Sequence, residues 1–298
     1  MQPYLITFAI PFYQNELLLK KAVLSVINQT ISDWRLIISL DNQLSDELLT
    51  FISALKDNRI SLVSNVNKGI CNNWNNCLSA VESSYVTLLH ADDELASNYV
   101  QVMFDVINNN PDSALYYCGV KIINQCSEPV FSFADSIKKV IQPRGKTIKL
   151  SGDVGLSTLL KGCFIFCPSI CYQTSIIKSY VFNERWQMVL DLDLYARMLF
   201  DGYTFIGSNT VAYYYRRHKN NQTAKLTEKL TRFDEEVSLY QEISQHAQIK
   251  QWKKTSKVAK NKNIIRLHVG YLIFKNICRL RISRVTQLML FYKNHFFT

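Results

Sequence analysis

Short apolar runs and amphipathic segments alternate along the first 95 residues of the chain. The short runs are rich in β-branched residues, which predicts buried strands. Between them, apolar residues recur every three or four positions, which predicts helices with one apolar face. We expect strands at 5–10, 36–40, 60–64 and 85–89, and helices at 16–27, 44–55 and 70–81. This order favours an α/β fold with a mainly parallel sheet and helices on both faces.

The pattern becomes less regular after residue 95. We expect helices at 98–109, 153–160 and 191–201, and strands at 114–123, 203–206 and 211–215. Residues 124–150 lack a clear period and contain Pro129, Pro143 and Gly145, so a loop-rich excursion is expected there.

The composition changes after about residue 223. No Asp or Glu follows Glu242, whereas Lys and Arg are frequent from residue 250 onward. Apolar residues between 264 and 292 recur at helical spacing, but Arg and Lys interrupt them too often for a membrane-spanning segment. We therefore expect an α/β domain at 1–223 and a basic helical extension at 224–298. The extension either lies on an anionic membrane surface or packs on the domain.

Composition and charge narrow the choice of partners. Of the 298 residues, 48% are hydrophobic and 19% charged, which is typical of a globular protein, and the net charge is +10. The excess of positive charge favours nucleotide phosphates, nucleic acid or an anionic membrane as partners. A basic segment followed by an apolar one is not seen at the N-terminus, so a cytoplasmic location is expected. The eight cysteines are expected to be free, including the evenly spaced Cys163, Cys167 and Cys171.

Acidic residues follow the apolar run Tyr85–Leu89. His90 ends this run, and Asp92 and Asp93 come directly after it. A strand that ends in this way brings the two carboxylates to the edge of the sheet where α/β proteins bind ligands. Adjacent carboxylates repel each other unless a cation lies beside them, and oxygen ligands suit Mg²⁺ or Mn²⁺. The alternative is a solvated turn whose acids stabilise the start of the next helix.

Six short motifs, taken in order, resemble those of the family 2 glycosyltransferases, which have the GT-A fold. They are residues 10–15 (IPFYQN), 25–30 (SVINQT), Asp41 at the end of the second strand, 67–69 (NKG), Asp92 with Asp93, and 191–197 (DLDLYAR) followed by 215–218 (YRRH). The resemblance covers roughly residues 4–223. The chain departs from the family at Asn42, His90 and Leu190, where the family usually has acidic residues.

The resemblance implies a site for a nucleotide-sugar donor. Its donor-binding residues would be Pro11, Tyr13, Asn15, Asp41, Lys68, Gly69 and Asp92, with Arg216, Arg217 and His218 on a lid over the diphosphate. Asp41 would accept a hydrogen bond from the base. Asp93 and Asp92 would hold Mn²⁺ or Mg²⁺, which neutralises charge on the leaving diphosphate.

The resemblance also implies an inverting reaction in which Asp191 is the catalytic base. Its carboxylate would take the proton from an acceptor hydroxyl that attacks the anomeric carbon. The alternative for Asp191 is a helix N-terminal acid stabilised by the helix dipole. Gly162 and Trp186 are predicted beside the acceptor, with Trp186 offering a flat face to a sugar ring.

We therefore expect a glycosyltransferase that uses a nucleotide sugar, with UDP as the expected nucleotide. The acceptor is expected to be a glycan or a lipid-linked saccharide in the synthesis of a bacterial surface polysaccharide. The basic extension would then hold the enzyme on the inner face of the plasma membrane, and nucleic acid is not an expected partner. Two alternatives remain: a nucleotidyltransferase, although residues 11–15 contain no glycine-rich basic loop, and a non-catalytic protein that binds nucleotide or nucleic acid.

Overall fold

A nine-stranded sheet forms the centre of the computed structural model, which describes residues 6–132, 138, 140–217 and 222–296. The elements of the first half are β1 (Ile6–Phe12), α1 (Glu16–Ile27), β2 (Trp34–Leu40), α2 (Asp46–Ala54), β3 (Ile60–Ser64), α3 (Ile70–Ser79), β4 (Tyr85–Leu88), β5 (Glu94–Leu95) and α4 (Tyr99–Asn108). β2 lies between β3 and β1, β4 lies on the other side of β1, and all three pairings are parallel. This half of the sheet confirms the predicted order of alternating strands and helices.

The second half of the sheet is mixed. Its elements are β6 (Leu115–Ile123), β7 (Thr147–Ser151), α6 (Gly152–Leu159), the short 3₁₀ helix η1 (Cys167–Ser169), β8 (Ile170–Gln173), α7 (Thr174–Ile177), α8 (Leu190–Phe200) and β9 (Thr204–Arg216). β8 is antiparallel to both β4 and β6, whereas β6 and β9 are parallel. β5 and β7 pair with β9 in antiparallel orientation.

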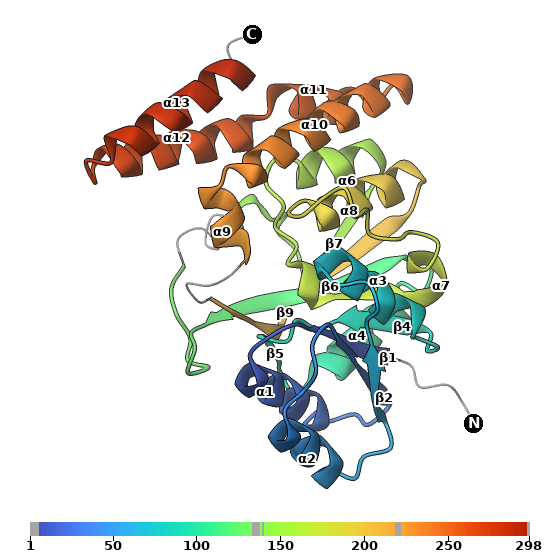
Figure 1. The fold of residues 1–298 in the computed structure, drawn as a ribbon. Coiled ribbons are helices and arrows are strands. Elements are labelled where there is room, and N and C mark those ends of the chain that lie inside the picture. Colours follow the sequence, from blue (N-terminus) through green and yellow to red (C-terminus); the bar gives the residue numbers. More distant parts are fainter. Residues whose placement is uncertain (1–5, 133–137, 139, 218–221, 297–298) are drawn as a thin grey trace.

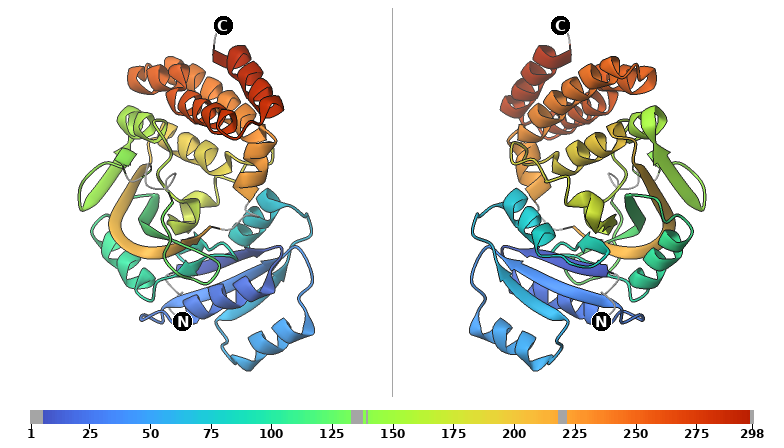
Figure 2. Two further views of the ribbon diagram at one scale, coloured as in Figure 1. Left: turned by 90° about the vertical axis from the view of Figure 1, so that its left-hand side faces the viewer. Right: turned by 90° about the vertical axis from the view of Figure 1, so that its right-hand side faces the viewer.

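The strands predicted at 203–206 and 211–215 are a single strand, β9. The polar residues 207–210 suggested a break, but they form an irregularity within the pairing of β9 with β6. Gly119 of β6 permits this close approach, because a Cβ there would lie only 2.6 Å from the Asn209 carbonyl oxygen. β9 is strongly curved (Figure 2). Its last residue, Arg216, reaches the turn after β4, where its N–H donates to Asp93 Oδ1. β7 is a second correction, since it begins inside the predicted loop-rich stretch.

Two hydrophobic clusters cover the two faces of the sheet. In β1 the side chains alternate, so that Phe8 and Ile10 join the cluster beneath α1 and α4, while Ala9 joins the cluster beneath α3 and α8. Trp34 and Tyr99 are fully buried in the first cluster. The predicted helices on both faces are therefore present.

Within residues 222–296, five helices follow the sheet. They are α9 (Gln222–Glu228), α10 (Thr231–Ile249), α11 (Lys253–Asn261), α12 (Asn263–Ile277) and α13 (Ile282–Phe296). α10–α13 lie beyond α6 and α8, at the opposite end of the molecule from α1 and α2 (Figure 1). Phe233, Tyr240 and Ile265 of these helices share one buried cluster with Leu194 of α8, so the extension packs on the α/β domain.

Candidate active site

The turn after β4 brings three potential metal ligands together. The N–H of Asp93 donates to the His90 carbonyl oxygen at 3.1 Å, which closes the turn. His90, Asp92 and Asp93 each place one ligand atom within 4.8 Å of those of the other two residues. The predicted acidic motif therefore lies at the carboxyl end of β4, where open α/β sheets bind their ligands.

Asp93 is the most deeply buried residue of this turn, with 1% of it exposed. Its Oδ1 accepts a hydrogen bond from the Arg216 N–H at 2.7 Å, and its Oδ2 accepts one from the Tyr213 hydroxyl at 2.9 Å. Burial, reinforced by the charge of Asp92, raises the pKa of the Asp93 carboxyl well above its ordinary value. Asp92 is only partly buried and is therefore the more accessible carboxylate for a cation.

His90 adds a nitrogen ligand to the two carboxylates. Its ring packs on Trp74 with the ring centres 5.5 Å apart, and burial lowers the pKa of the imidazole against the opposing effect of Asp92. The buried Nε2 atom has no hydrogen-bond partner among the described residues, and Nδ1 lies 3.9 Å from Asp93 Oδ2. A neutral imidazole with a free lone pair beside two carboxylates suits a divalent cation. The residues present therefore fit a divalent metal.

Arg216 does not lie on a lid, contrary to the sequence-based prediction. Its side chain is fully buried, and its Nε donates to the Asp92 carbonyl oxygen at 2.7 Å. The guanidinium also forms an ion pair with Glu94 and donates to Ser127 Oγ at 3.2 Å. Because these protein groups occupy the guanidinium, Arg216 fixes the position of the acidic turn instead of gripping a diphosphate.

Arg217 is the more accessible of the two arginines. Its N–H donates to the Ile123 carbonyl oxygen at 2.9 Å, and its guanidinium lies 4.9 Å from the centre of the Tyr215 ring. Arg217 directly follows β9, and its predicted place over a diphosphate stays a prediction. His218, the third predicted lid residue, lies outside the described residues.

Asp41 holds the predicted turn 67–69 against the end of β2. Its Oδ1 accepts a hydrogen bond from the Asn65 side-chain amide, and its Oδ2 accepts one from the Gly69 N–H at 3.3 Å. Gly69 has a φ of +116°, which explains why a glycine stands there, and Lys68 beside it is exposed. Asp41 is 6% exposed, so its hydrogen bond to a base stays a prediction.

The predicted donor residues after β1 lie close to the end of β2. Pro11 is half-buried within β1, and Tyr13 is 59% exposed. Asn15 uses its side-chain oxygen to cap α1, accepting from the Leu18 N–H at 3.2 Å. Asn42 donates from its side-chain amide to the Tyr13 carbonyl oxygen at 2.7 Å. An amide can form this bond and a carboxylate cannot, which gives a structural reason for the departure at this position.

Asp191 lies in the first turn of α8 and is partly exposed. Its Oδ1 accepts a hydrogen bond from the Leu192 N–H at 2.8 Å. Burial raises the pKa of the Asp191 carboxyl, whereas the positive charges of Lys138 and Arg232 oppose that rise. A carboxylate with a raised pKa is a stronger base, as proton abstraction from a hydroxyl requires. Asp193, in the same turn, forms an i,i+4 ion pair with Arg197 at 2.9 Å.

The segment before Asp191 is held by a residue that sequence reasoning missed. Glu235 of α10 accepts hydrogen bonds from the N–H groups of Gln187 and Met188 at 2.9 and 2.8 Å. Nothing in the local sequence of either segment signals this contact, because it joins positions 47 residues apart.

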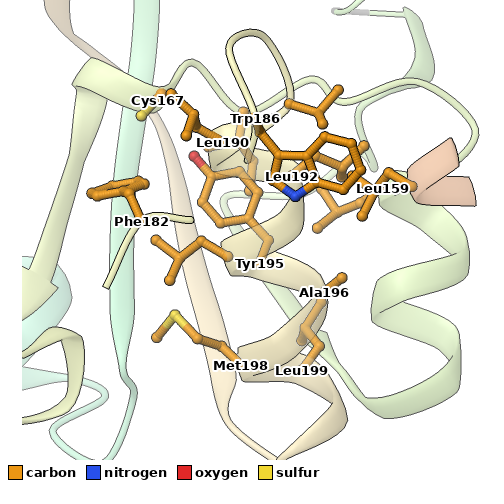
Figure 3. Close-up of a cluster of buried hydrophobic side chains, with 14 of the residues drawn as sticks. Leu159, Cys167, Phe182, Trp186, Leu190, Leu192, Tyr195, Ala196, Met198 and Leu199 are labelled. Atoms are coloured by element: carbon orange, nitrogen blue, oxygen red, sulfur yellow. The ribbon is translucent and has the colours of Figure 1, made fainter. Parts of the chain in front are cut away.

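Gly162 and Trp186 are not on an open surface, which corrects their predicted role beside an acceptor. Trp186 is 3% exposed and lies among Leu159, Leu190 and Leu192 (Figure 3). Gly162 is buried with a φ of +152°, and a Cβ there would lie 2.7 Å from Ile141 Cδ1. Both residues therefore serve packing in this structure.

The family comparison matches the half of the chain that carries the acidic turn. Residues 7–160 match the family described as Glycosyl transferase family 2. An Escherichia coli protein named UDP-Glc:alpha-D-GlcNAc-diphosphoundecaprenol beta-1,3-glucosyltransferase WfgD is 25% identical over 183 residues, or 61% of this chain and 65% of that protein. A Campylobacter jejuni protein named GalNAc(5)-diNAcBac-PP-undecaprenol beta-1,3-glucosyltransferase is 34% identical over 103 residues, or 33% of each protein. The chain thus matches less than two thirds of the length of either relative.

The fold is similar to that of a solved crystal structure. The crystal structure of S. aureus TarS 1-349 in complex with UDP-GlcNAc gives a TM-score of 0.61 at 14% sequence identity, and the match covers 80% of this chain and 66% of that one. At this level of identity the similarity concerns the fold, and it agrees with the GT-A architecture expected from the sequence.

Proposed function

The chain belongs to glycosyl transferase family 2 and is a glycosyltransferase, and we propose that it transfers a sugar from a UDP-sugar to a hydroxyl of a lipid-linked saccharide with inversion. The proposed transferase domain comprises residues 1–223, followed by the extension at 224–298. The observation that carries the proposal is a pair of acidic centres, of which the first lies at the carboxyl end of β4. They are the turn with His90, Asp92 and Asp93, and the start of α8 with Asp191.

The short helix η1 connects these two centres. The Tyr99 hydroxyl shares a hydrogen bond with Thr87 of β4 and donates to the Ser169 carbonyl oxygen of η1 at 3.4 Å. Cys167 of the same helix is buried, and burial is the main reason why the pKa of its thiol is raised. The negative charge of Asp191 raises this pKa further. η1 therefore contacts β4, and Asp191 is near enough for its charge to act on Cys167 of η1, which supports a proposed base close to the proposed donor site.

In the proposed reaction, the Asp191 carboxylate takes the proton from the acceptor hydroxyl. The hydroxyl oxygen then bonds to the anomeric carbon of the donor while the bond from that carbon to the nucleotide diphosphate breaks. Because the diphosphate leaves from the face opposite the attack, the anomeric configuration inverts. A single carboxylate suffices for this proton transfer, so Leu190 in place of the family's usual acid does not prevent it.

We propose that Asp92 and His90 hold the metal, with Asp93 fixing the geometry of the turn and offering its remaining lone pairs. A bound divalent cation would supply positive charge at the leaving diphosphate. The imidazole ligand favours Mn²⁺ over Mg²⁺, because Mg²⁺ prefers oxygen ligands. Arg217, which follows β9 directly, would contribute a second positive group to the binding of the diphosphate.

The proposed donor and acceptor rest on the relatives. The printed names of the two relatives specify glucosyltransferases with undecaprenol-linked acceptors, and for the first of them a UDP-glucose donor. Asp41 and Tyr13 would contact the nucleotide, since they lie at the adjacent ends of β2 and β1. By this analogy the product would be a precursor of a bacterial surface polysaccharide.

We also propose that the extension contacts an anionic membrane on its cytoplasmic face. Along α12 and the following turn, Leu267, Phe274 and Leu280 are 70%, 66% and 85% exposed, and Arg279 and Arg281 lie beside them. No described helix is both long and apolar enough to cross a membrane. Exposed apolar residues interspersed with arginines are typical of helices that lie at a membrane surface.

The test of the proposed function is UDP release from a panel of UDP-sugars in the presence of Mn²⁺ and a synthetic GlcNAc-diphospho-lipid. We expect release with at least one UDP-sugar, a product lipid heavier by one sugar, and loss of both with EDTA or in Asp191→Asn. Equal rates for the native protein and Asp191→Asn would refute the role of Asp191. Stabilisation by UDP and Mn²⁺ without turnover would instead support the non-catalytic alternative.

A further inference from the structure

The N-cap residue of α8 makes no side-chain hydrogen bond to the start of the helix. Val189 stands at the N-cap position, and its apolar side chain cannot accept hydrogen bonds from the first N–H groups of the helix. Unpaired N–H groups at a helix start are costly when they are partly buried, and they also make that start mobile. This helix start carries Asp191, whose placement decides whether it reaches an acceptor hydroxyl.

Glu235 of α10 accepts hydrogen bonds from the backbone that directly precedes the first turn of α8. Both carboxylate oxygens of Glu235 accept from the Gln187 N–H, at 2.9 and 3.1 Å, and Oε2 also accepts from the N–H groups of Met188 and Val189 at 2.8 and 3.4 Å. A carboxylate at this position is doubly suited, because it accepts hydrogen bonds and carries the negative charge that a helix N-terminus favours. Three successive backbone groups are thus directed at one side chain of the C-terminal extension.

A second contact fastens the same segment to α10. The guanidinium of Arg185 forms an ion pair with Glu242 at 2.6 Å and lies 4.3 Å from the centre of the Trp186 ring. Trp186 itself is buried against α8. The segment 185–189 is therefore attached to α10 at both ends, immediately before the proposed base.

We propose that Glu235 is a positioning residue for the transfer reaction: from the C-terminal extension it holds the backbone of residues 187–189, and so keeps Asp191, which follows, in its working position. The proposal rests on the proposed function, because it takes Asp191 as the base. It gives the extension a role in catalysis that is independent of any membrane contact. Small displacements of a catalytic group are expected to reduce turnover strongly even when the substrate still binds.

The chain supplies a matched control in Asp153. This carboxylate, at the start of α6, accepts from the Lys254 and Thr255 N–H groups at 3.0 and 2.7 Å and so caps α11. Like Glu235, it joins the domain to the extension through hydrogen bonds from backbone N–H groups. Unlike Glu235, it does not hold the segment before Asp191.

The test compares Glu235→Ala, Glu235→Gln and Asp153→Ala in the full chain. For Glu235→Ala we expect a loss in kcat of about tenfold or more, an unchanged KM for the UDP-sugar and an unchanged melting-temperature shift with UDP and Mn²⁺. Hydrogen exchange should become faster in a peptide that covers residues 187–189. Glu235→Gln keeps one acceptor oxygen, so its kcat and its exchange rate at 187–189 should lie between those of the native protein and Glu235→Ala. Asp153→Ala should speed exchange at 254–255, lower the melting temperature and leave kcat unchanged.

The possible failures can be told apart. Unchanged exchange at 187–189 in Glu235→Ala, or native kcat despite faster exchange, would overturn the role of Glu235. An equal loss of kcat in Asp153→Ala would also overturn it, because the effect would then reflect general stability. If Asp191→Asn retained full turnover, the proposed function would fail, and the exchange data alone would decide whether Glu235 holds the segment.

Discussion

Arg216, at the end of β9, and Glu94, in β5, form an ion pair in which the arginine side chain is fully buried. The same guanidinium donates to the Asp92 carbonyl oxygen, and the Arg216 N–H donates to Asp93 Oδ1. β9 and the acidic turn come from parts of the chain more than 100 residues apart, and this arginine joins them. The buried Arg216 guanidinium therefore holds the residues of the proposed metal site in position.

Replacing Arg216 with Met should destabilise the fold strongly. The change leaves the Glu94 carboxylate without its partner and removes the side-chain hydrogen bonds to Asp92, Asn124 and Ser127. Breaking such a buried pair costs about 3–5 kcal/mol. Urea unfolding at neutral pH measures the difference. Arg217→Met is the matched control: its free energy of unfolding should change by no more than about 0.5 kcal/mol, with an increase in the KM for the UDP-sugar. Equal losses in both variants would contradict the distinction drawn between these neighbours.

Asp92 and Asp93 should also differ when each is replaced by Ala. Asp92→Ala should keep the native melting temperature without ligand but lose the additional stabilisation by UDP that requires Mn²⁺. Asp93→Ala should unfold more easily even without ligand, because the Tyr213 hydroxyl and the Arg216 N–H lose their acceptor, at roughly 1–3 kcal/mol for each buried donor. Calorimetry with UDP, and with either Mn²⁺ or EDTA, separates the two effects. A full metal-dependent shift in Asp92→Ala would exclude it as a ligand.

The sequence predicted the parallel half of the sheet because its strands and helices are local patterns with strong periodicity. The acidic turn was found for the same reason, since its residues are adjacent in the chain. Arg216 was assigned to a lid because its burial depends on Glu94 and Asn124, which a local pattern cannot show. Trp186 was assigned to an acceptor surface because an aromatic ring gives the same signal in a core and in a sugar site. No pattern in the sequence indicated the role of Glu235, because its partners are backbone N–H groups, which every residue except proline has.

The raised pKa of Asp191 predicts how its contribution to stability changes with pH. In the folded protein this carboxyl holds its proton at pH values where the unfolded chain has lost it. The free energy of unfolding therefore decreases as the pH rises from the ordinary carboxyl value through the raised one, by about 1.4 kcal/mol for each unit between them. Asp191→Asn removes this effect, so we expect it to melt at a higher temperature than the native protein at pH 8. The difference should disappear toward pH 4.

The control for this pH series is Asp112→Asn, which changes an exposed residue of the same type. Its melting temperature should follow that of the native protein at every pH. A lower melting temperature for Asp191→Asn at pH 8 would mean that the ionised carboxylate stabilises the fold, which would contradict the burial argument. The same raised pKa should move the acid limb of kcat to higher pH than an ordinary carboxyl would give.

Binding to lipid vesicles should depend on both the charge and the apolar residues of α12 and the turn after it. The full chain should float with vesicles that contain phosphatidylglycerol and much less with pure phosphatidylcholine, because the arginines are attracted to anionic headgroups. Arg279→Gln combined with Arg281→Gln should weaken binding roughly 10–30-fold, from about 1 kcal/mol per charge. Phe274→Ser combined with Leu280→Ser should weaken it further, since both side chains are more than half exposed and would enter the lipid.

The exposed Leu17 of α1, at the opposite end of the molecule, provides the control for these vesicle experiments. Leu17 is 68% exposed and Phe274 is 66% exposed. Leu17→Ser therefore removes exposed apolar surface as Phe274→Ser does, but at a site away from the extension. This variant should bind vesicles as the native chain does. If it bound as weakly as the Phe274 and Leu280 variant, the association would be non-specific. Charge attraction at a surface is screened within about 10 Å even at moderate salt. If the native chain bound both lipid compositions equally, and 0.5 M salt did not weaken the binding, the arginines would not contribute.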